Sequence, residues 1–342
     1  MKKEFIIYNP GANVEVTTFY VDVIGKSLEK SGFAVRYTTD IKKEQNKNAG
    51  ILVTGITDVK SARRMGYKTI ILWMQGSLPE ESFMRHGSYI RKWILDLMEG
   101  YAVKKSSFIF FVSDEMKSHV EKKHKIVLKN TYIMPCFNCY LNKQAFGLAA
   151  KYKENSFVYV GGLQKWQCFA ETVQIYAEIE KRLRDTKLYV YTKETETAEK
   201  LLEKFGIKNR QVKYVTQEHL SEELQDKKFG FVIRKDTVVN QVSTPTKLSN
   251  YISCGIIPIF TEAIRDFTNV MEHNKYCMII RNELGIEKAA EEVCSSDLLG
   301  DIDNDAIYKE YKKIFESYYS EQLHINMASE KLKKFLRMEL AL

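Results

Sequence analysis

Short apolar runs alternate with longer polar or helical stretches along the whole chain. The runs at 4–8, 50–54 and 107–112 are apolar almost throughout, as in strands that are buried on both faces of a parallel sheet. Between the first of these runs and the next, Phe19, Val23 and Leu28 mark one face of a helix expected over 17–30. Further strands are expected at 33–38, 68–73, 157–160, 229–233 and 256–260. The alternation predicts an α/β protein with doubly wound parallel sheets.

The length of the chain predicts two domains. A chain of 342 residues exceeds what one hydrophobic core usually organises. The segment YIMPCFNCYLNKQAF closes the first half, and a new strand pattern begins with SFVYVGG at 156. We therefore expect a boundary within 146–155, with an N-terminal domain over 1–148 and a C-terminal domain over 149–319.

The segment 229–260 is the most informative part of the chain because it brings cations toward one point. Arg234 follows an apolar strand, where open α/β sheets place their ligand contacts. The run Ser-Thr-Pro-Thr at 243–246 is expected to cap and open a helix whose first turn carries Lys247. The two cations and the amides of the helix start together suit a diphosphate. The alternative is an ordinary strand-helix-strand unit with solvated basic residues.

A second candidate wall of the same pocket lies at the start of the second half. The strand at 157–160 is followed by Gly161 and Gly162, with Lys165 shortly before a helix expected over 167–183. Glycines there allow the backbone to approach a ligand closely. A plain tight turn explains the two glycines equally well when they are considered alone.

The chain resembles nucleotide-sugar glycosyltransferases of family 4, which have the two-domain GT-B architecture. The resemblance rests on an Arg after a strand, the pattern N-x-x-S-x-P-x-K at 240–247, a Tyr-containing helix and G-x-x-P-I at 255–259. It extends over nearly the whole chain. The resemblance implies two Rossmann-like domains that face each other across a cleft, with a C-terminal helix at about 320–342 crossing back to the first domain. It also implies transfer with retention of anomeric configuration and without a metal.

The candidate donor site combines the residues with the family pattern. The catalytic candidates are Arg234, Lys247 and Lys165, and the donor-binding candidates are Gly161, Gly162, Asn240, Ser243, Thr244, Thr246 and Asn250. Two departures from the family stand out. Gly162 occupies a position where the family usually has Arg, and Val242 and Asn250 occupy the positions of its two glutamates. The Asn250 amide is expected to bond a ribose hydroxyl in place of the second carboxylate.

The block that begins at Ile70 resembles the family segment on the acceptor side. A strand at 69–73 ends before a polar loop, and Pro79 begins a helix with carboxylates in its first turn. The acceptor-side candidates are Gly11, Gln75, Gly76, Glu80 and His86. The alternative for Glu80 is a helix-start charge that favours the helix dipole.

The charged residues are distributed unevenly along the chain. The net charge is +8, and residues 1–150 hold 23 Lys and Arg against 14 Asp and Glu. A helix expected over 85–105 mixes aromatic and basic residues, which suits peripheral contact with an anionic inner membrane or, alternatively, an ordinary buried face. No helix-turn-helix, zinc-finger or RNA-binding signature is present, so nucleic acid is not an expected partner.

Other chemistries find little support in the sequence. The six cysteines contain one C-x-x-C pair without further ligands nearby, so we expect no metal site and no disulfides. The DIDND segment at 301–305 is expected to be a solvated helix start. No G-x-G-x-x-G follows the first strand, which disfavours a dinucleotide oxidoreductase. No apolar run is long enough to cross a bilayer, and no signal peptide is evident, so the expected location is cytoplasmic.

The expected function is a glycosyltransferase, hexosyl- or acetylhexosaminyl-, that takes a nucleotide-diphosphate sugar. Its expected acceptor is a glycan or lipid-linked glycan of bacterial surface polysaccharide synthesis, and no cofactor is expected. Two alternatives remain open: a nucleotide-sugar epimerase of similar fold, and a non-catalytic nucleotide- or sugar-binding scaffold.

Overall fold

The computed structural model describes residues 4–10 and 14–340. It divides into two compact units, of which the first comprises Met1–Asn138, Val242–Thr244 and Tyr318–Leu342. The second comprises Cys139–Gln241 and Pro245–Ser317. The first unit thus ends before the boundary expected at 148, because the intervening segment packs with the second unit. Within that unit, the Asn142 amide donates to the Ser253 carbonyl across 2.8 Å.

The first unit contains a parallel sheet of six strands, in agreement with the predicted α/β class. Its strands are β1 (Glu4–Tyr8), β2 (Ala34–Thr38), β3 (Gly50–Val53), β4 (Ile70–Met74), β5 (Phe108–Phe111) and β6 (Thr131–Ile133), in the order β2-β1-β3-β4-β5-β6. The central strands β3, β4 and β5 are buried at every position, as their unbroken apolar sequences predict.

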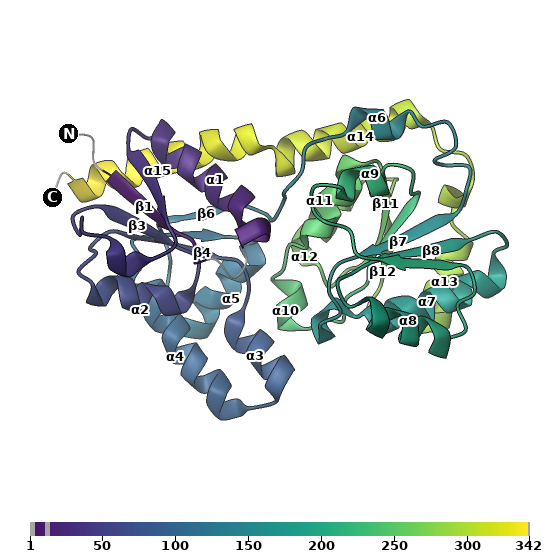
Figure 1. The fold of residues 1–342 in the computed structure, drawn as a ribbon, viewed down its shortest axis with the longest axis horizontal. Coiled ribbons are helices and arrows are strands. Elements are labelled where there is room, and N and C mark those ends of the chain that lie inside the picture. Colours follow the sequence, from purple (N-terminus) through teal and green to yellow (C-terminus); the bar gives the residue numbers. More distant parts are fainter. Residues whose placement is uncertain (1–3, 11–13, 341–342) are drawn as a thin grey trace. The chain divides into compact units, whose positions relative to one another are not determined.

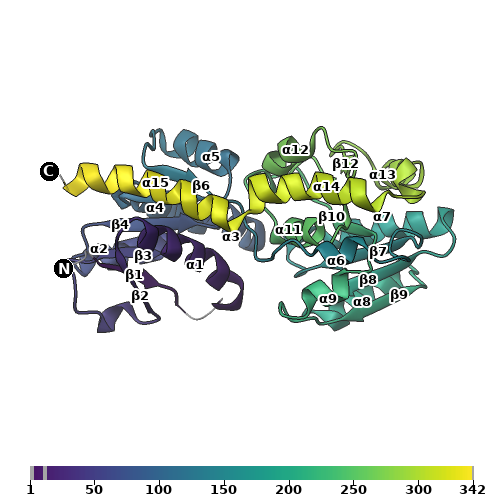
Figure 2. The same ribbon diagram turned by 90° about the horizontal axis from the view of Figure 1, so that it is seen from above.

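Helices cover both faces of this sheet (Figure 1). They are α1 (Val14–Lys30), the 3₁₀ turn η2 (Ile41–Lys43), α2 (Ile56–Arg64), α3 (Leu78–His86), α4 (Tyr89–Lys105), α5 (Asp114–His124) and the C-terminal α15 (Glu321–Leu340). α15 runs beside α1 on one face, as both views show (Figures 1 and 2). The Ser31 hydroxyl donates to the Ser329 carbonyl across 3.1 Å, and Lys26 pairs with Glu321 at 2.5 Å. α2 and α4 pack against each other on the opposite face.

The predicted start of the helix expected over 85–105 is wrong, because one helix ends and another begins there. Gly87 ends α3 with φ 66°, in the left-handed region that favours glycine. Ser88 then caps α4, and its hydroxyl accepts from the Arg91 amide across 3.3 Å. Arg85 and His86 therefore belong to the helix that begins near Pro79, and the second helix begins four residues later than expected.

The second unit repeats the parallel six-stranded design. Its strands are β7 (Ser156–Val160), β8 (Lys187–Tyr191), β9 (Arg210–Lys213), β10 (Phe229–Val232), β11 (Ile257–Thr261) and β12 (Met278–Ile280), in the order β12-β11-β10-β7-β8-β9. β7 pairs with both β8 and β10, so the order of strands reverses between β7 and β10. Ligands of open α/β sheets bind at the carboxyl ends of the two strands that flank such a switch point.

The helices of the second unit also lie on both faces of its sheet (Figure 1). They are α6 (Lys143–Phe146), the 3₁₀ turn η3 (Lys165–Gln167), α7 (Phe169–Arg182), α8 (Thr195–Lys204), α9 (Leu220–Leu224), α10 (Val238–Gln241), α11 (Thr246–Ser253), α12 (Arg265–Met271), α13 (Ile286–Cys294), the 3₁₀ turn η4 (Asp297–Leu299) and α14 (Asn304–Ile314). A π-helical segment (Phe315–Tyr319) follows α14. α13 packs on α7. On β10, a Cβ at Gly230 would lie 2.5 Å from the ring of Tyr251, so the glycine allows α11 to approach the sheet.

Candidate functional site

Two loops and one helix start meet at the switch point of the second sheet. Gly161 follows β7 and has φ 124°, which a side chain rarely permits. Arg234 follows β10 by two residues, and Lys247 lies in the first turn of α11. The parallel register places the ends of β7 and β10 side by side. The strand order therefore brings together residues that are far apart in the sequence.

Arg234 is held by its backbone and directed toward η3. Its amide donates to the Thr261 hydroxyl across 2.8 Å, and its carbonyl accepts from the same hydroxyl across 2.7 Å. One guanidinium nitrogen donates to the Gln167 carbonyl across 2.6 Å, and the other donates to the Gln167 side-chain oxygen Oε1. Both ends of the residue are thus fixed by neutral oxygen atoms.

Lys247 reaches the same side-chain oxygen from the opposite element. Its Nζ donates to Gln167 Oε1 across 3.1 Å and lies over the ring of Tyr159, 4.2 Å from the ring centroid. A Cβ at Gly161 would lie 3.2 Å from this Nζ, closer than most real contacts of that kind. The backbone conformation at 161 therefore favours glycine, and a side chain there would also displace the Lys247 ammonium by a few tenths of an ångström.

The two cations are buried without an anionic partner. Arg234 is 3% exposed and Lys247 is 8% exposed, and among the described residues no carboxylate forms an ion pair with either. Burial lowers the pKa of Lys247 well below its usual value, and the nearby Arg234 charge lowers it further. Burial also lowers the pKa of Arg234. Since buried charges are normally paired, this arrangement favours an anionic ligand that supplies the missing charge.

Gln167 is the site residue that sequence reasoning missed. It ends η3, and its side-chain oxygen accepts from both Arg234 and Lys247. Positive charges and glycines are the features that indicate diphosphate contacts in a sequence, and a neutral amide is neither. Its place two residues after Lys165, in the loop that follows the paired glycines, was the one signal available.

Several predicted donor residues have other contacts. Lys165 is exposed, and in the part of the chain that the structure describes no hydrogen bond joins its side chain to Arg234 or Lys247. The side-chain nitrogen of Asn250 donates to the Thr246 carbonyl of its own helix across 3.3 Å. The side-chain nitrogen of Asn240 donates to the Lys235 carbonyl across 3.0 Å. The Gly162 carbonyl accepts from the Tyr159 hydroxyl across 2.6 Å.

The expected Ser/Thr cap of α11 is wrong. Pro245 is the N-cap residue of this helix, and it provides no side-chain hydrogen bond. Ser243 and Thr244 belong to the first unit. There the Thr244 hydroxyl accepts from the Cys136 amide across 3.0 Å, and the Val242 carbonyl accepts from the Ser113 hydroxyl across 2.6 Å. Contacts made by this short segment with distant residues therefore outweigh its local capping preference.

A cavity of about 280 Å³ lies beside Arg234, within the second unit. Its walls include the apolar side chains of Ile233 and Ile280 as well as Arg234 and Asn282. The Asn282 amide nitrogen donates to the Arg234 carbonyl across 2.7 Å. The other amide atom, Oδ1, is buried and accepts no hydrogen bond from any described residue. Charged residues also line the cavity, namely Glu171, Lys235, Asp236 and Arg281, and Lys235 pairs with Glu171 at 2.5 Å. A lining that mixes apolar side chains with polar groups and an unused acceptor suits a flat, partly polar ring.

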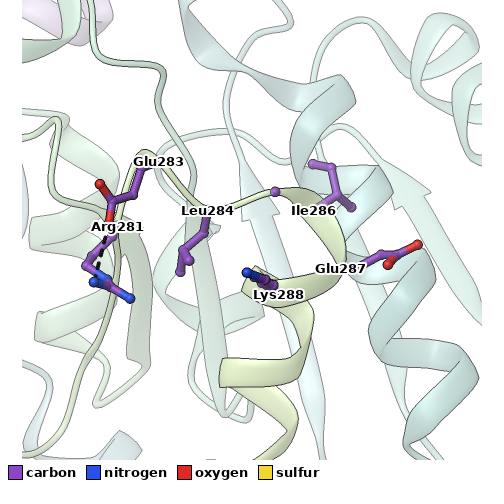
Figure 3. Close-up of a pocket in the computed structure, with 7 residues that line it drawn as sticks. Arg281, Glu283, Leu284, Ile286, Glu287 and Lys288 are labelled. Atoms are coloured by element: carbon purple, nitrogen blue, oxygen red, sulfur yellow. Dashed lines mark ion pairs between the residues drawn. The ribbon is translucent and has the colours of Figure 1, made fainter.

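A second hollow of about 650 Å³ adjoins this cavity along the loop between β12 and α13 (Figure 3). It is lined by Arg281 and by the residues from Glu283 to Lys288, whose charged side chains have both signs. Arg281 pairs with Glu283 at 3.3 Å, and the close-up shows this pair beside Leu284. Because one loop and the start of one helix supply the whole lining, polar groups from different elements do not converge on this hollow.

The predicted acceptor-side residues lie in the first unit, except that Gly11 lies outside the described residues. Gln75 and Gly76 follow β4, and His86 is exposed at the end of α3. Glu80 pairs with Lys123 at 2.8 Å and with Lys92 at 3.3 Å. Although burial raises it, the pKa of Glu80 falls well below its usual range, chiefly because His119 and Lys123 bond the carboxylate. These contacts favour the helix-start alternative for Glu80, and its place on the acceptor side stays a prediction.

The described residues hold no group of three or more His, Cys, Asp or Glu arranged to bind a metal ion. The cysteines are free thiols. Asp303 of the DIDND segment caps α14, and its carboxylate accepts from the amides of Asp305 and Ala306 across 3.0 Å. Of the helices that the structure describes, none combines the length and apolar character needed to cross a membrane.

No protein-family model matches the sequence, and comparison with curated proteins also gives no match. Comparison with solved structures does give matches. The lipopolysaccharide outer core galactosyltransferase WaaB superposes with a TM-score of 0.66 at 11% identity, covering 99% of this chain and 100% of that one. Sucrose-phosphate synthase from Thermosynechococcus elongatus gives a TM-score of 0.66 at 9% identity over the same shares of the two chains. The chain has the GT-B fold.

Larger GT-B proteins also match. TarM from S. aureus, in a complex with UDP, fondaparinux and α-GlcNAc-glycerol, gives a TM-score of 0.63 at 11% identity. That match covers 84% of this chain, which spans only 55% of the TarM chain. At such identities the comparison establishes the GT-B fold alone, and the site residues rest on the geometry above.

Proposed function

We propose that the protein is a glycosyltransferase that takes a nucleotide-diphosphate sugar as donor. The observation that carries this proposal is the pair of buried cations, Arg234 and Lys247, which share one neutral acceptor at the switch point of the second sheet. A diphosphate supplies the negative charge that this arrangement lacks, and its oxygens displace Gln167 as the partner of the ammonium. The nucleoside occupies the adjoining cavity, where Asn282 Oδ1 accepts a hydrogen bond from it.

The same cations promote departure of the nucleoside diphosphate. As the bond from the anomeric carbon to the phosphate oxygen breaks, positive charge grows on the sugar ring and negative charge grows on the leaving phosphate. Lys247 and Arg234 are already in place and desolvated, so they stabilise this negative charge without reorganisation. The amides at the start of α11 add partial positive charge. We assign no residue as the nucleophile. Retention of the anomeric configuration and a reaction without a metal ion remain part of the proposal.

The acceptor is proposed to be a glycan or lipid-linked glycan of a bacterial surface polysaccharide. Structures of similar fold support this choice. TarM and pneumococcal GtfA are described in complexes with UDP and GlcNAc-containing compounds, and WaaB is described as a lipopolysaccharide galactosyltransferase. We accordingly propose a hexose or an acetylhexosamine as the transferred sugar. The cytoplasmic location expected from the sequence remains a prediction.

Release of nucleoside diphosphate from UDP- and GDP-sugars, measured with and without glycan acceptors, tests this function. We expect acceptor-dependent release by the wild type and a loss of about 100- to 1000-fold in Lys247→Met. Lys165→Met is the matched control. Although the sequence made Lys165 a catalytic candidate, its side chain is exposed and bonds neither Arg234 nor Lys247 among the described residues, so we expect this variant to keep full activity. Interconversion of nucleotide sugars without an acceptor would show an epimerase instead, and nucleotide binding without turnover would show a scaffold.

A further inference from the structure

Helix α4 of the first unit exposes a continuous row of large apolar side chains. These residues, here called the apolar stripe, are Tyr89, Ile90, Trp93, Ile94, Leu97 and Tyr101. Ile90 is 73% exposed and Trp93 is 62% exposed, whereas side chains of this size are normally buried. Their spacing of three, four and one residues places them on one side of the helix. So large an exposed apolar surface marks an interaction site.

The opposite side of α4 holds the helix in place through charges. Its acidic residues are Asp96 and Glu99, and both pair with Lys123 of α5, at 2.6 Å and 2.7 Å. Glu99 is buried and also contacts His124 at 2.8 Å. Lys92 pairs with Asp96 at 2.8 Å. Every carboxylate of the helix is therefore engaged away from the apolar stripe, and the stripe itself carries none.

Two exposed lysine side chains lie at the end of the apolar stripe. Lys104 and Lys105 form the last turn of α4 and are exposed, and among the described residues neither side chain forms an ion pair. The first half of the chain carries the excess of positive charge, 23 Lys and Arg against 14 Asp and Glu over residues 1–150. A partner that combines an apolar region with negative charge fits this surface, whereas a second copy of the same basic surface would be repelled.

The chemistry of the apolar stripe identifies the partner more closely. Tyr89, Trp93 and Tyr101 are residue types that concentrate at the boundary between lipid headgroups and acyl chains. Ile90, Ile94 and Leu97 lie among them, as in helices that rest in the plane of a membrane surface. We propose that α4 docks the protein on an anionic membrane, with the apolar stripe in the headgroup boundary and Lys104 and Lys105 against the lipid phosphates. This inference goes beyond the proposed transfer reaction and does not depend on it.

Co-sedimentation of the full chain with lipid vesicles tests the proposal. We expect binding to vesicles of phosphatidylcholine mixed with phosphatidylglycerol, weak binding to phosphatidylcholine alone, and loss of binding in high salt. Ile90→Glu should weaken binding by at least about tenfold. Val127→Glu is the matched control, because Val127 is an 81% exposed aliphatic residue of the same unit outside α4. Replacing Lys104 and Lys105 by Gln should weaken binding by about 30-fold.

Fluorescence and size measurements make the test decisive. The emission of Trp93 should shift to shorter wavelength on vesicles, and Trp93→Phe should abolish the shift while keeping the binding. Lys247→Met should bind vesicles like the wild type even if it loses transfer activity, so failure of one proposal leaves the other intact. Equal binding to neutral and anionic vesicles, absence of binding, or a dimer that Ile90→Glu converts to a monomer would each overturn the membrane assignment.

Discussion

The ammonium of Lys247 donates to the side-chain oxygen of Gln167 across 3.1 Å, and that oxygen also accepts from Arg234. One neutral amide thus serves two buried cations, one from the loop after β10 and the other from the first turn of α11. A neutral acceptor offsets only part of the cost of burying two like charges. The site is arranged for an anion, and this arrangement leads to changes in stability and binding that can be measured.

Substituting Gln167→Glu places a carboxylate where the diphosphate is expected. The new charge pairs with Lys247 and Arg234, so the melting temperature of the free protein should rise. The same carboxylate repels a diphosphate, so affinity for nucleoside diphosphates should fall by at least about tenfold. Gln144→Glu, at an exposed position of the same unit away from the two cations, is the control and should change neither quantity. A more stable protein with undiminished affinity would contradict the proposed position of the diphosphate.

Removing the Lys247 charge should leave the free protein as stable as before. Lys247→Met keeps most of the buried volume and eliminates a cation that forms no ion pair with any residue the structure describes. We expect the free energy of unfolding to stay the same or to rise by up to about 2 kcal/mol, measured by urea denaturation. A decrease of about 2 kcal/mol or more would show that the lysine serves mainly to hold the fold together.

Gly161 should tolerate no side chain. Gly161→Ala introduces a Cβ at φ 124° and 3.2 Å from the Lys247 ammonium. We expect a loss of about 1–3 kcal/mol in the free energy of unfolding, together with weaker nucleotide binding because the lysine is displaced. Gly285→Ala is the matched control for stability, since a Cβ there meets no atom within 4 Å and its φ is −71°. Equal stability of the two variants would exclude the strain argued for Gly161.

The buried Lys151 should make stability depend on pH. It donates to the Gln225 carbonyl across 2.8 Å, and burial lowers its pKa to about 7. Between this value and the pKa of an unfolded lysine, about 10.4, the unfolded chain binds the extra proton. Stability contributed by this group therefore rises with pH, by up to about 1.4 kcal/mol per pH unit, above pH 7.

Urea denaturation from pH 7 to 8.5 measures this dependence. Lys151→Met should flatten the rise, whereas Lys153→Met, at an exposed position nearby, should leave the slope unchanged. An identical slope in the wild type and Lys151→Met would mean that the lysine stays protonated in the folded protein.

The sequence predicted most of the sheet structure because buried parallel strands have unbroken apolar sequences. Phe108–Phe111 and Phe229–Val232 are strands that are buried at every position, as expected. The start of α4 was mispredicted because helical spacing continues across Gly87, and only its left-handed backbone separates the two helices. Local periodicity carries no information about such a break.

Part of the candidate site was also visible in the sequence. Arg234 and Lys247 follow from the positions of cations after a strand and in a helix start. Gln167 does not, because its role depends on two partners more than 60 residues away, at separations of 67 and 80 residues. Similarly, Thr244 has a good capping sequence, but it bonds the distant amide of Cys136. Tertiary contacts of this kind outweigh local preference.

Binding of nucleoside diphosphates tests the central claim most directly. Melting temperatures of the wild type, Lys247→Met and Lys165→Met would be compared with UDP, GDP, ADP, CMP, NAD and inorganic pyrophosphate. We predict that one nucleoside diphosphate stabilises the wild type and Lys165→Met, by about 2.7 kcal/mol at a concentration of 100 times Kd, and does not stabilise Lys247→Met. Stabilisation by NAD alone, or equal stabilisation of the wild type and Lys247→Met, would contradict a diphosphate site at Arg234 and Lys247.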